Sequence, residues 1–311
     1  MLNNDILEQL ATARTTGYIE TPLHLAAYVD IPSSHQDAVR QIAGHCQVSA
    51  RNALDETPIH RAALLNNSGA IRLLGSLQPH ALELVDCFGR SPVWHAAATG
   101  SVEALRVLLS RGALINVNLA DDLGLTPLHT ACRGGHEPAA AMLLKKGARQ
   151  YVTTHKLDLT PMDLAAMFGH EEILEGLEFD GLGPLSETQA MHNRALHIAA
   201  SCGQLSCVKT LLSAGANWHA SYDYYFKLTL NHAEVVERCG DARFVAALEG
   251  HEDIFKYFDS QLAPPGQSYE PTVQVPSHPD DNSNPYGMAS GAGEDSIPPG
   301  SGIYYYRSSY G

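Results

Sequence analysis

The 311-residue chain lacks any apolar run of 18 residues, and it is poor in basic side chains, with 20 Lys and Arg against 34 Asp and Glu. Without such a run, no membrane-spanning helix is predicted. The formal net charge of −14 argues against a general nucleic-acid binder, which needs a basic face, and against electrostatic docking on an anionic membrane. We therefore expect neither nucleic acid nor a membrane as a partner.

The chain also lacks a cysteine framework, a secretory signal and a recognisable catalytic motif. Its six cysteines have no regular spacing, and its start, MLNNDILEQL, carries acids and no basic segment. Free thiols indicate a reducing compartment, so we expect the cytoplasm, the nucleus or both. No G-x-S-x-G, Walker A or G-x-G-x-x-G sequence and no quartet of zinc ligands is present. We predict that the protein is not an enzyme and holds neither cofactor nor metal.

What the chain has instead is a repeated heptad. The sequences TPLHLAA, TPIHRAA, SPVWHAA, TPLHTAC and TPMDLAA begin at Thr21, Thr57, Ser91, Thr126 and Thr160, and weaker copies begin near Arg194 and Thr229. In each heptad, Thr or Ser suits a helix N-cap, and Pro suits the first helical position, where no N–H is needed. The alanines that follow lie on one helix face and are small enough for neighbouring helices to approach closely.

A second helix follows in most copies, as in VEALRVLL (102–109) and LSCVKTLL (205–212), and a glycine follows its end. One such unit cannot bury its own apolar face, but stacked units can. The period and the T-P-L-H-x-A pattern resemble the ankyrin repeat family over residues 1–262.

The resemblance implies an all-α fold, an α-solenoid of about seven hairpin–helix–turn–helix repeats with atypical terminal repeats. For the seventh repeat we expect a first helix in NHAEVVERCGD, a second in ARFVAALEG and a closing helix in HEDIFKYFDSQL. Residues 263–311 contain 8 Pro, 7 Gly and 8 Ser but only four of Val, Ile, Leu and Phe. We expect them to form a disordered tail, because they cannot bury enough apolar surface.

The resemblance also implies structural roles for particular side chains. Histidines at the fourth heptad position are expected to bond the cap hydroxyl and the neighbouring repeat, rather than a metal: His24, His60, His129, His197 and His232. The family's hairpin glycine is replaced by Asp55 and Asp158, which tolerate positive φ, and elsewhere by Ile19, His192 and Lys227. We expect the last three hairpins to deviate from the family geometry.

Candidate contact residues lie three positions before each heptad, where the family has its hairpin tips. All seven are apolar or aromatic: Tyr18, Leu54, Phe88, Leu123, Leu157, Met191 and Phe226. Arg90 lies directly before its heptad, and Tyr28, Leu64, Arg133, Met167 and Phe168 are expected on the groove side of the first helices. An exposed apolar row usually marks a partner site. Alternatively, each tip packs against the next hairpin, and the sequence does not decide between the two.

The main functional prediction is a monomeric, non-enzymatic module that binds a protein partner in the concave groove of hairpins and inner helices. The alternative is an adaptor that recruits a client to a ligase or a transcription complex, with the tail as a second, linear site. Two further hypotheses are the repeat half of a once larger protein and a substrate for hydroxylation at Asn116. The identity of the partner does not follow from the sequence.

Overall fold

The structure is a computed structural model that describes residues 20–28, 36–45, 47–110, 115–177, 185–222, 225–229, 232–236 and 240–262. The chain divides into two parts, residues 1–178 and 179–311. Both are built mainly from helices, which confirms the predicted ankyrin-type α-solenoid. The predicted tail and the tip residue Tyr18 lie outside the described residues. The longest helix spans 17 residues, and no described helix is long and apolar enough to cross a membrane.

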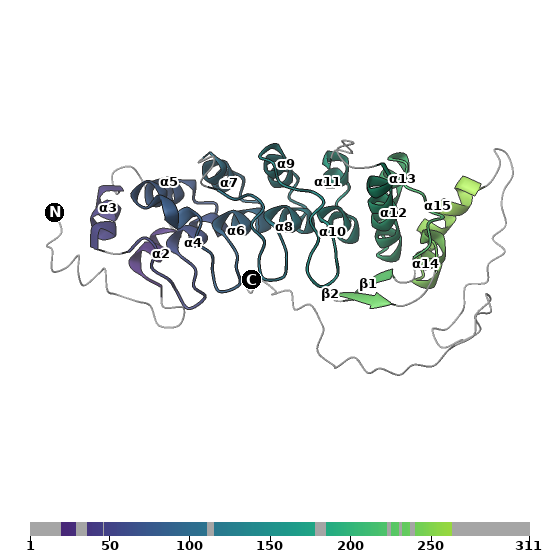
Figure 1. The fold of residues 1–311 in the computed structure, drawn as a ribbon, viewed down its shortest axis with the longest axis horizontal. Coiled ribbons are helices and arrows are strands. Elements are labelled where there is room, and N and C mark those ends of the chain that lie inside the picture. The colour runs from purple at the N-terminus through teal and green to yellow at the C-terminus, as the bar shows by residue number, and fades with distance from the viewer. Residues whose placement is uncertain are drawn as a thin grey trace. The chain divides into compact units, whose positions relative to one another are not determined.

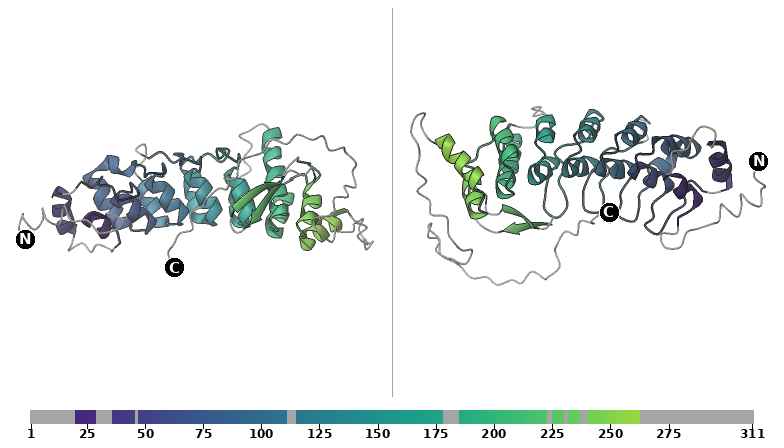
Figure 2. Two further views of the ribbon diagram at one scale, coloured as in Figure 1. Left: turned by 90° about the horizontal axis from the view of Figure 1, so that it is seen from below. Right: turned by 180° about the vertical axis from the view of Figure 1, so that it is seen from behind.

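The described residues of the N-terminal part contain five helix pairs, which we call the first to fifth repeats. Their inner helices are α2 (Pro22–Ala26), α4 (Pro58–Leu64), α6 (Pro92–Ala98), α8 (Pro127–Gly134) and α10 (Pro161–Phe168). Their outer helices are α3 (Gln36–His45), α5 (Ser68–Leu77), α7 (Val102–Leu109), α9 (Glu137–Lys145) and α11 (Glu171–Gly176), and a 3-10 turn, η2 (Pro79–Leu82), follows α5. Within this part, the inner helices form one row and the outer helices a second row (Figures 1 and 2).

Local chemistry sets the start of each inner helix. Each begins at the proline of its heptad, and the preceding Thr or Ser is the N-cap residue with extended backbone angles. In α8, for example, the Thr126 side chain accepts a hydrogen bond from the backbone N–H of His129. The same helix ends at Gly135, whose φ of 71° is left-handed and suits glycine.

The core of the N-terminal part runs between the two rows of helices. Ala62, Ala63, Ala96 and Ala97 are fully buried, so adjacent inner helices can pack closely. Leu105, Leu108 and Leu143 of the outer helices are also fully buried. Among the described residues, the main contacts of each repeat are with its sequence neighbours, as expected for a solenoid, so stability comes from successive interfaces rather than from one central core.

The C-terminal part contains α12 (Leu185–Ser201), α13 (Leu205–Ser213), the strands β1 (Tyr225–Thr229) and β2 (His232–Val236), α14 (Ala242–Leu248) and α15 (Glu252–Leu262). The two strands pair antiparallel, with Tyr225 opposite Val236. Beyond them, the backbones of Tyr222 and Gly240 exchange two hydrogen bonds of 3.1 and 3.2 Å. Helix α12 packs on α13, α14 and β1, and α15 packs on α13 and α14.

The prediction of a seventh heptad near Thr229 is wrong. Thr229 ends β1, and His232 begins β2 rather than lying in a helix. The first helix of this repeat is α14, whose N-cap Asp241 accepts a hydrogen bond from the Phe244 backbone N–H at 2.8 Å. The segment ARFVAAL is therefore the first helix, and α15 is the second. An insertion between Tyr222 and Gly240 forms the hairpin and displaces the heptad along the chain.

The expectation of a hairpin before the sixth heptad is also wrong. Met191 and His192 lie inside α12, which runs without interruption into the heptad at Arg194. The reason is local: residues 185–201 contain neither proline nor glycine, and Arg194 replaces the Thr-Pro signal that starts the earlier inner helices. Nothing in this stretch breaks the helix, so Met191 is not a hairpin tip.

Candidate functional site

Four of the predicted contact residues lie at hairpin tips: Leu54, Phe88, Leu123 and Leu157. All four are half-buried rather than fully exposed. Asp55 and Asp158 adopt φ angles of 57° and 50° in the positions where Gly89 and Gly124 also have positive φ, as expected from their short polar side chains. Phe226 lies in β1, so the C-terminal part does not continue this row of tips.

Neighbouring tips are joined through their backbones. The carbonyl of Leu54 accepts a hydrogen bond from the Cys87 N–H at 3.1 Å, and the carbonyl of Phe88 accepts one from the Asp122 N–H at 3.0 Å. The Leu123 carbonyl accepts one from the His155 N–H, also at 3.0 Å. These bonds agree in part with the alternative that each tip packs against the next hairpin. The backbones of these three tips are bonded to the next hairpin, but their side chains remain half-exposed. The tips therefore form a fixed, continuous edge across the second to fifth repeats.

Inside each hairpin, one side chain replaces missing backbone partners. Asp86 Oδ1 accepts hydrogen bonds from the backbone N–H groups of Phe88 (2.9 Å) and Arg90 (3.0 Å). Asp121 Oδ1 does the same for Leu123 (3.0 Å) and Leu125 (2.8 Å). Such side-chain bonds hold a tight turn in one conformation. They fix the direction in which Phe88 and Leu123 leave the backbone.

The third hairpin adds a cluster of aromatic and guanidinium groups. The Arg90 guanidinium lies over the Phe88 ring, 4.5 Å from its centroid, and over the Trp94 ring at 5.2 Å. Its Nε and one terminal nitrogen each lie 2.7 Å from Asp86 Oδ2. Cation–π contacts of this kind orient a flexible arginine. Phe88 and Arg90, both predicted from the sequence, are thus brought together with Trp94, which was not.

A ladder of ring nitrogens connects successive repeats at the inner helices. The Nε2 atoms of His24, His60 and His129 lie 2.9, 3.1 and 3.1 Å from the carbonyl oxygens of Glu56, Arg90 and Leu159 in the next repeat. His197 makes the same contact with Gly240 at 3.1 Å. In the third repeat, Trp94 replaces histidine and donates from Nε1 to the Leu125 carbonyl at 3.1 Å. The predicted contact with the neighbouring repeat is confirmed for these four histidines, and the predicted contact with the cap hydroxyl for His24, His60 and His129.

These contacts determine the tautomer of the ring. A carbonyl oxygen only accepts, so Nε2 must carry the hydrogen, and Nδ1 accepts from the backbone N–H and hydroxyl of the cap threonine, as His129 does with Thr126 at 3.1 and 2.8 Å. Burial lowers the pKa of His60 to about 3 and that of His129 to about 4, because a charged ring would lose its hydration. The ladder is therefore built from neutral rings.

A second polar network lies on the first two repeats. Tyr28 donates from its hydroxyl to Glu20 Oε1 at 2.9 Å and accepts from the Arg61 guanidinium, which also lies over its ring. Arg61 is buried and lies 3.5 Å from Glu56 Oε2. The ring of Tyr28 nevertheless stays exposed, as do Leu25 and Leu65. Three of the five exposed large apolar side chains among the described residues therefore belong to the first two inner helices or the turns directly after them.

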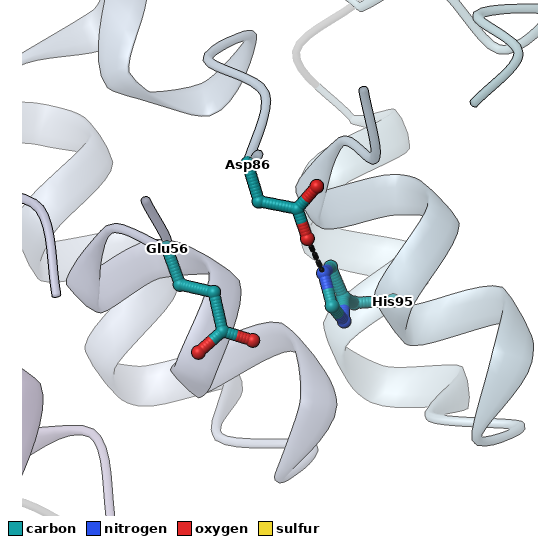
Figure 3. A group of neighbouring side chains, drawn as sticks. All are labelled: Glu56, Asp86 and His95. Carbon is teal, nitrogen blue, oxygen red and sulfur yellow. Dashed lines mark hydrogen bonds and ion pairs between the residues drawn. The ribbon is translucent and has the colours of Figure 1, made fainter. Parts of the chain in front are cut away.

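Glu56, Asp86 and His95 form a buried cluster between these networks (Figure 3). One ligand-type atom from each lies within 4.8 Å of the others, a spacing that a metal ion could bridge. However, Asp86 Oδ2 already accepts from Arg90, and His95 Nε2 lies 3.0 Å from it. Burial alone would raise the pKa of Asp86, but these hydrogen bonds outweigh it and hold the pKa well below its usual range. The cluster is therefore part of an ion-pair network in which Arg90 compensates the charge of Asp86 and Arg61 that of Glu56.

Sequence reasoning missed Trp94 and Asp86 as parts of the site. Trp94 occupies the histidine position of its heptad, and an indole N–H is a donor that can replace the imidazole Nε2–H. Asp86 begins DCFGR, the sequence of a tight turn, so its role in the turn was visible. Its contact with His95, nine positions along the chain, depends on how the hairpin folds onto α6, which no local pattern reveals.

Comparisons with known proteins agree with this architecture. The family model for ankyrin repeats in three copies matches residues 73–154 and 115–180, and that for a single ankyrin repeat matches residues 191–222. The chain is 26% identical over 271 residues to the human "SH3 and multiple ankyrin repeat domains protein 2", covering 85% of this chain and 12% of that protein. It is 27% identical over 205 residues to the mouse "B-cell lymphoma 3 protein homolog", covering 64% of this chain and 44% of that protein.

A third relative, a putative ankyrin repeat protein of Rickettsia bellii, is 36% identical over 90 residues, which is 29% of this chain and 49% of that protein. The chain thus spans less than half the length of each of these relatives. The similarity therefore concerns the repeats and not the whole relatives.

Proposed function

Because the chain belongs to the ankyrin repeat family, whose repeats form protein-interaction modules, we propose that it binds a partner protein through the tips of its second to fifth repeats and the adjoining inner helices. The observation that carries the proposal is the half-buried cluster of Phe88, Arg90 and Trp94. Aromatic and arginine side chains are the residues that most often dominate binding energy at interfaces.

Preorganisation supports this assignment. Phe88 is held through its N–H by Asp86 and through its carbonyl by Asp122, and Arg90 is held by the Asp86 carboxylate. Because these side chains are already held in one conformation, binding a partner costs less conformational entropy, and more of the interaction energy contributes to affinity. Because Asp86 already neutralises Arg90, we expect the partner to offer apolar or aromatic groups here rather than a lone carboxylate.

The exposed rings and chains of Leu25, Tyr28 and Leu65 extend the proposed surface toward the first two repeats. Exposed apolar groups that gather on one face are a common mark of a protein-binding surface. Arg61, which is itself paired with Glu20 and Glu56, contacts both the hydroxyl and the ring of Tyr28 and so orients this exposed side chain. The proposed contact surface thus combines two rigid aromatic groups, one at each end of the second repeat.

The test compares the proteins captured from a native lysate by the full chain and by variants of equal helicity. Phe88→Ala combined with Leu123→Ser should reduce capture of a specific partner at least about tenfold, as expected when central contacts worth about 1.4 kcal/mol or more are removed. Leu77→Ser is the matched control, because Leu77 is similarly apolar and is exposed at the end of the outer helix α5. Equal capture by the double variant and the wild type would refute the assignment of the tips.

The adaptor function remains the second proposal. It is supported by the composition of residues 263–311, which hold six of the 13 tyrosines in a segment whose sequence could act as a linear motif. Deleting residues 263–311 discriminates between the two functions. Loss of one partner with retention of another would support an adaptor, whereas an unchanged set of partners would leave only the interaction module.

A further inference from the structure

The third and fourth hairpins are built alike but are connected to the inner helices by different chemistry. In both, an aspartate Oδ1 accepts two backbone N–H groups of its own turn. The carbonyl that closes the third hairpin, Arg90 C=O, accepts from the imidazole of His60. The corresponding carbonyl of the fourth hairpin, Leu125 C=O, accepts from the indole of Trp94. An imidazole can take up a proton in the pH range where proteins remain folded, and an indole cannot.

Two histidines from two helices meet at the third hairpin. His60 of α4 reaches Arg90 C=O, and His95 of α6 reaches the Asp86 carboxylate at 3.0 Å. Their rings are in edge-to-face contact with centroids 5.5 Å apart. The opposite edge of His60 is also occupied, because Nδ1 accepts the N–H and the hydroxyl of Thr57 at 3.0 and 2.8 Å. A proton added to Nδ1 would point at the backbone N–H of Thr57 and break that contact, while the Thr57 hydroxyl would have to turn from donor to acceptor.

We propose that residues 86–90 form a proton-sensitive latch, in which neutral His60 holds the hairpin that carries Phe88 and Arg90 and protonation of His60 releases it. Because Phe88 and Arg90 belong to the proposed partner-binding surface, release of the hairpin would change binding there. This regulatory role rests on the proposed function. The fourth hairpin, held by Trp94, lacks this sensitivity. Acid therefore loosens the third hairpin relative to the fourth, whereas the second and fifth hairpins, like the third, are contacted by an imidazole, from His24 and His129 respectively.

The groups around His60 agree with this direction. Burial opposes the charged ring most strongly, followed by His95, and Arg51 also opposes it, while Asp86 and the Arg90 carbonyl favour it. The contributions that oppose the charged form of His60 outweigh those that favour it, so the His60 ring is neutral while the hairpin is closed. When the hairpin opens, the ring gains water and regains an ordinary affinity for protons. Opening therefore takes up a proton below about pH 6.5, and each further pH unit favours the open form about tenfold.

The test is hydrogen exchange of the full chain at pH 7.5 and 5.5, with rates corrected for the intrinsic pH dependence of exchange. The amides of Phe88 and Arg90 should show an opening constant about ten times larger at pH 5.5, from one proton taken up at a group of ordinary histidine pKa. The amides of Leu123 and Leu125 in the fourth hairpin should show no such rise. The wild type alone thus contains the probe and its matched control.

A variant separates titration from loss of the contact. His60→Gln keeps an N–H donor near the Arg90 carbonyl but cannot titrate, so the tenfold rise at Phe88 and Arg90 should disappear. If both hairpins open more at pH 5.5 by the same factor, if neither changes, or if His60→Gln retains the rise, the latch is wrong. The measurement needs no partner, so it fails or succeeds independently of the binding proposal, which the lysate comparison tests.

Discussion

Acid should weaken the repeat stack through His129, and the structure gives the size of the effect. His129 is fully buried, and its two ring nitrogens contact Thr126 and the Leu159 carbonyl of the next repeat. Its pKa is lowered from 6.5 to about 4, mainly by burial. A folded-state pKa below the unfolded value means that the unfolded chain binds more protons between these two pH values. Stability is therefore full above about pH 6.5 and falls as the pH decreases toward 4.

The magnitude follows from linkage. At pH 5, the unfolded ring is almost fully protonated and the folded ring is about 10% protonated, so His129 alone lowers the free energy of unfolding by about 2 kcal/mol relative to pH 7.5. The full loss, reached below pH 4, is about 3 kcal/mol, since one pKa unit corresponds to about 1.4 kcal/mol. The pKa values of His24, His60 and His197 are also lowered. The wild type therefore loses more free energy of unfolding in acid than His129 alone accounts for.

The assay is urea unfolding of the full chain followed by circular dichroism at pH 7.5 and pH 5, for the wild type and His129→Gln. Glutamine keeps a donor for the Leu159 carbonyl but does not titrate. Because it does not reproduce both ring contacts of His129, we expect the variant to be less stable than the wild type at pH 7.5. The stability gap between the two proteins should narrow by about 2 kcal/mol at pH 5. His155→Gln, which makes the same substitution at an exposed position of the fifth hairpin, is the matched comparison variant. Parallel pH dependence of wild type and His129→Gln would refute the reasoning.

Substitutions at three further sites, each with a comparison variant, test the packing and the caps by urea unfolding. Leu108→Ala empties a fully buried site in α7 and should cost about 2–5 kcal/mol, whereas the same change at exposed Leu77 should cost about 0.5 kcal/mol or less; equal losses would contradict the stacked core. Trp94→Phe removes the donor to the Leu125 carbonyl and should cost about 1–3 kcal/mol, while Trp94→His, which restores the ladder, should be the more stable variant of the two. Asp241→Ala should lower the stability of the C-terminal part by about 1 kcal/mol and Asp241→Asn by less; equal effects would argue against the cap.

The sequence predicts the inner helices well because the signals that start them are local. A threonine or serine followed by proline satisfies the first turn by itself, and all five heptads with this pair begin a helix at the proline. The positive φ of Asp55 and Asp158 was predictable for the same reason. Where the pair is missing, spacing alone misplaced the start of the helix: the repeat at Arg194 is present, but its helix α12 begins before the heptad, and at Thr229 the chain forms a strand.

The seventh repeat shows why spacing misleads. Thr229 and His232 match the heptad in distance and residue type, but the segment lacks proline and forms strands. The true start, Asp241, uses a different cap residue and lies farther along the chain. In the same way, the contacts that organise the third hairpin join His60 to Arg90 and His95 to Asp86. Such contacts depend on tertiary packing, and a single sequence carries no local signal for them.

The paired backbones of Tyr222 and Gly240 close the base of the β1–β2 insertion, and the ring of His197 still reaches the Gly240 carbonyl beyond it. The start of α14 is thus held beside the end of the preceding segment independently of how long the chain between Tyr222 and Gly240 is. A peptide with adjacent termini grafted in place of residues 223–239 would keep this pairing and the contacts of α12 with α13 and α14, at about 0.6 kcal/mol per doubling of loop length, but it would have to replace the contact that β1 makes with α12.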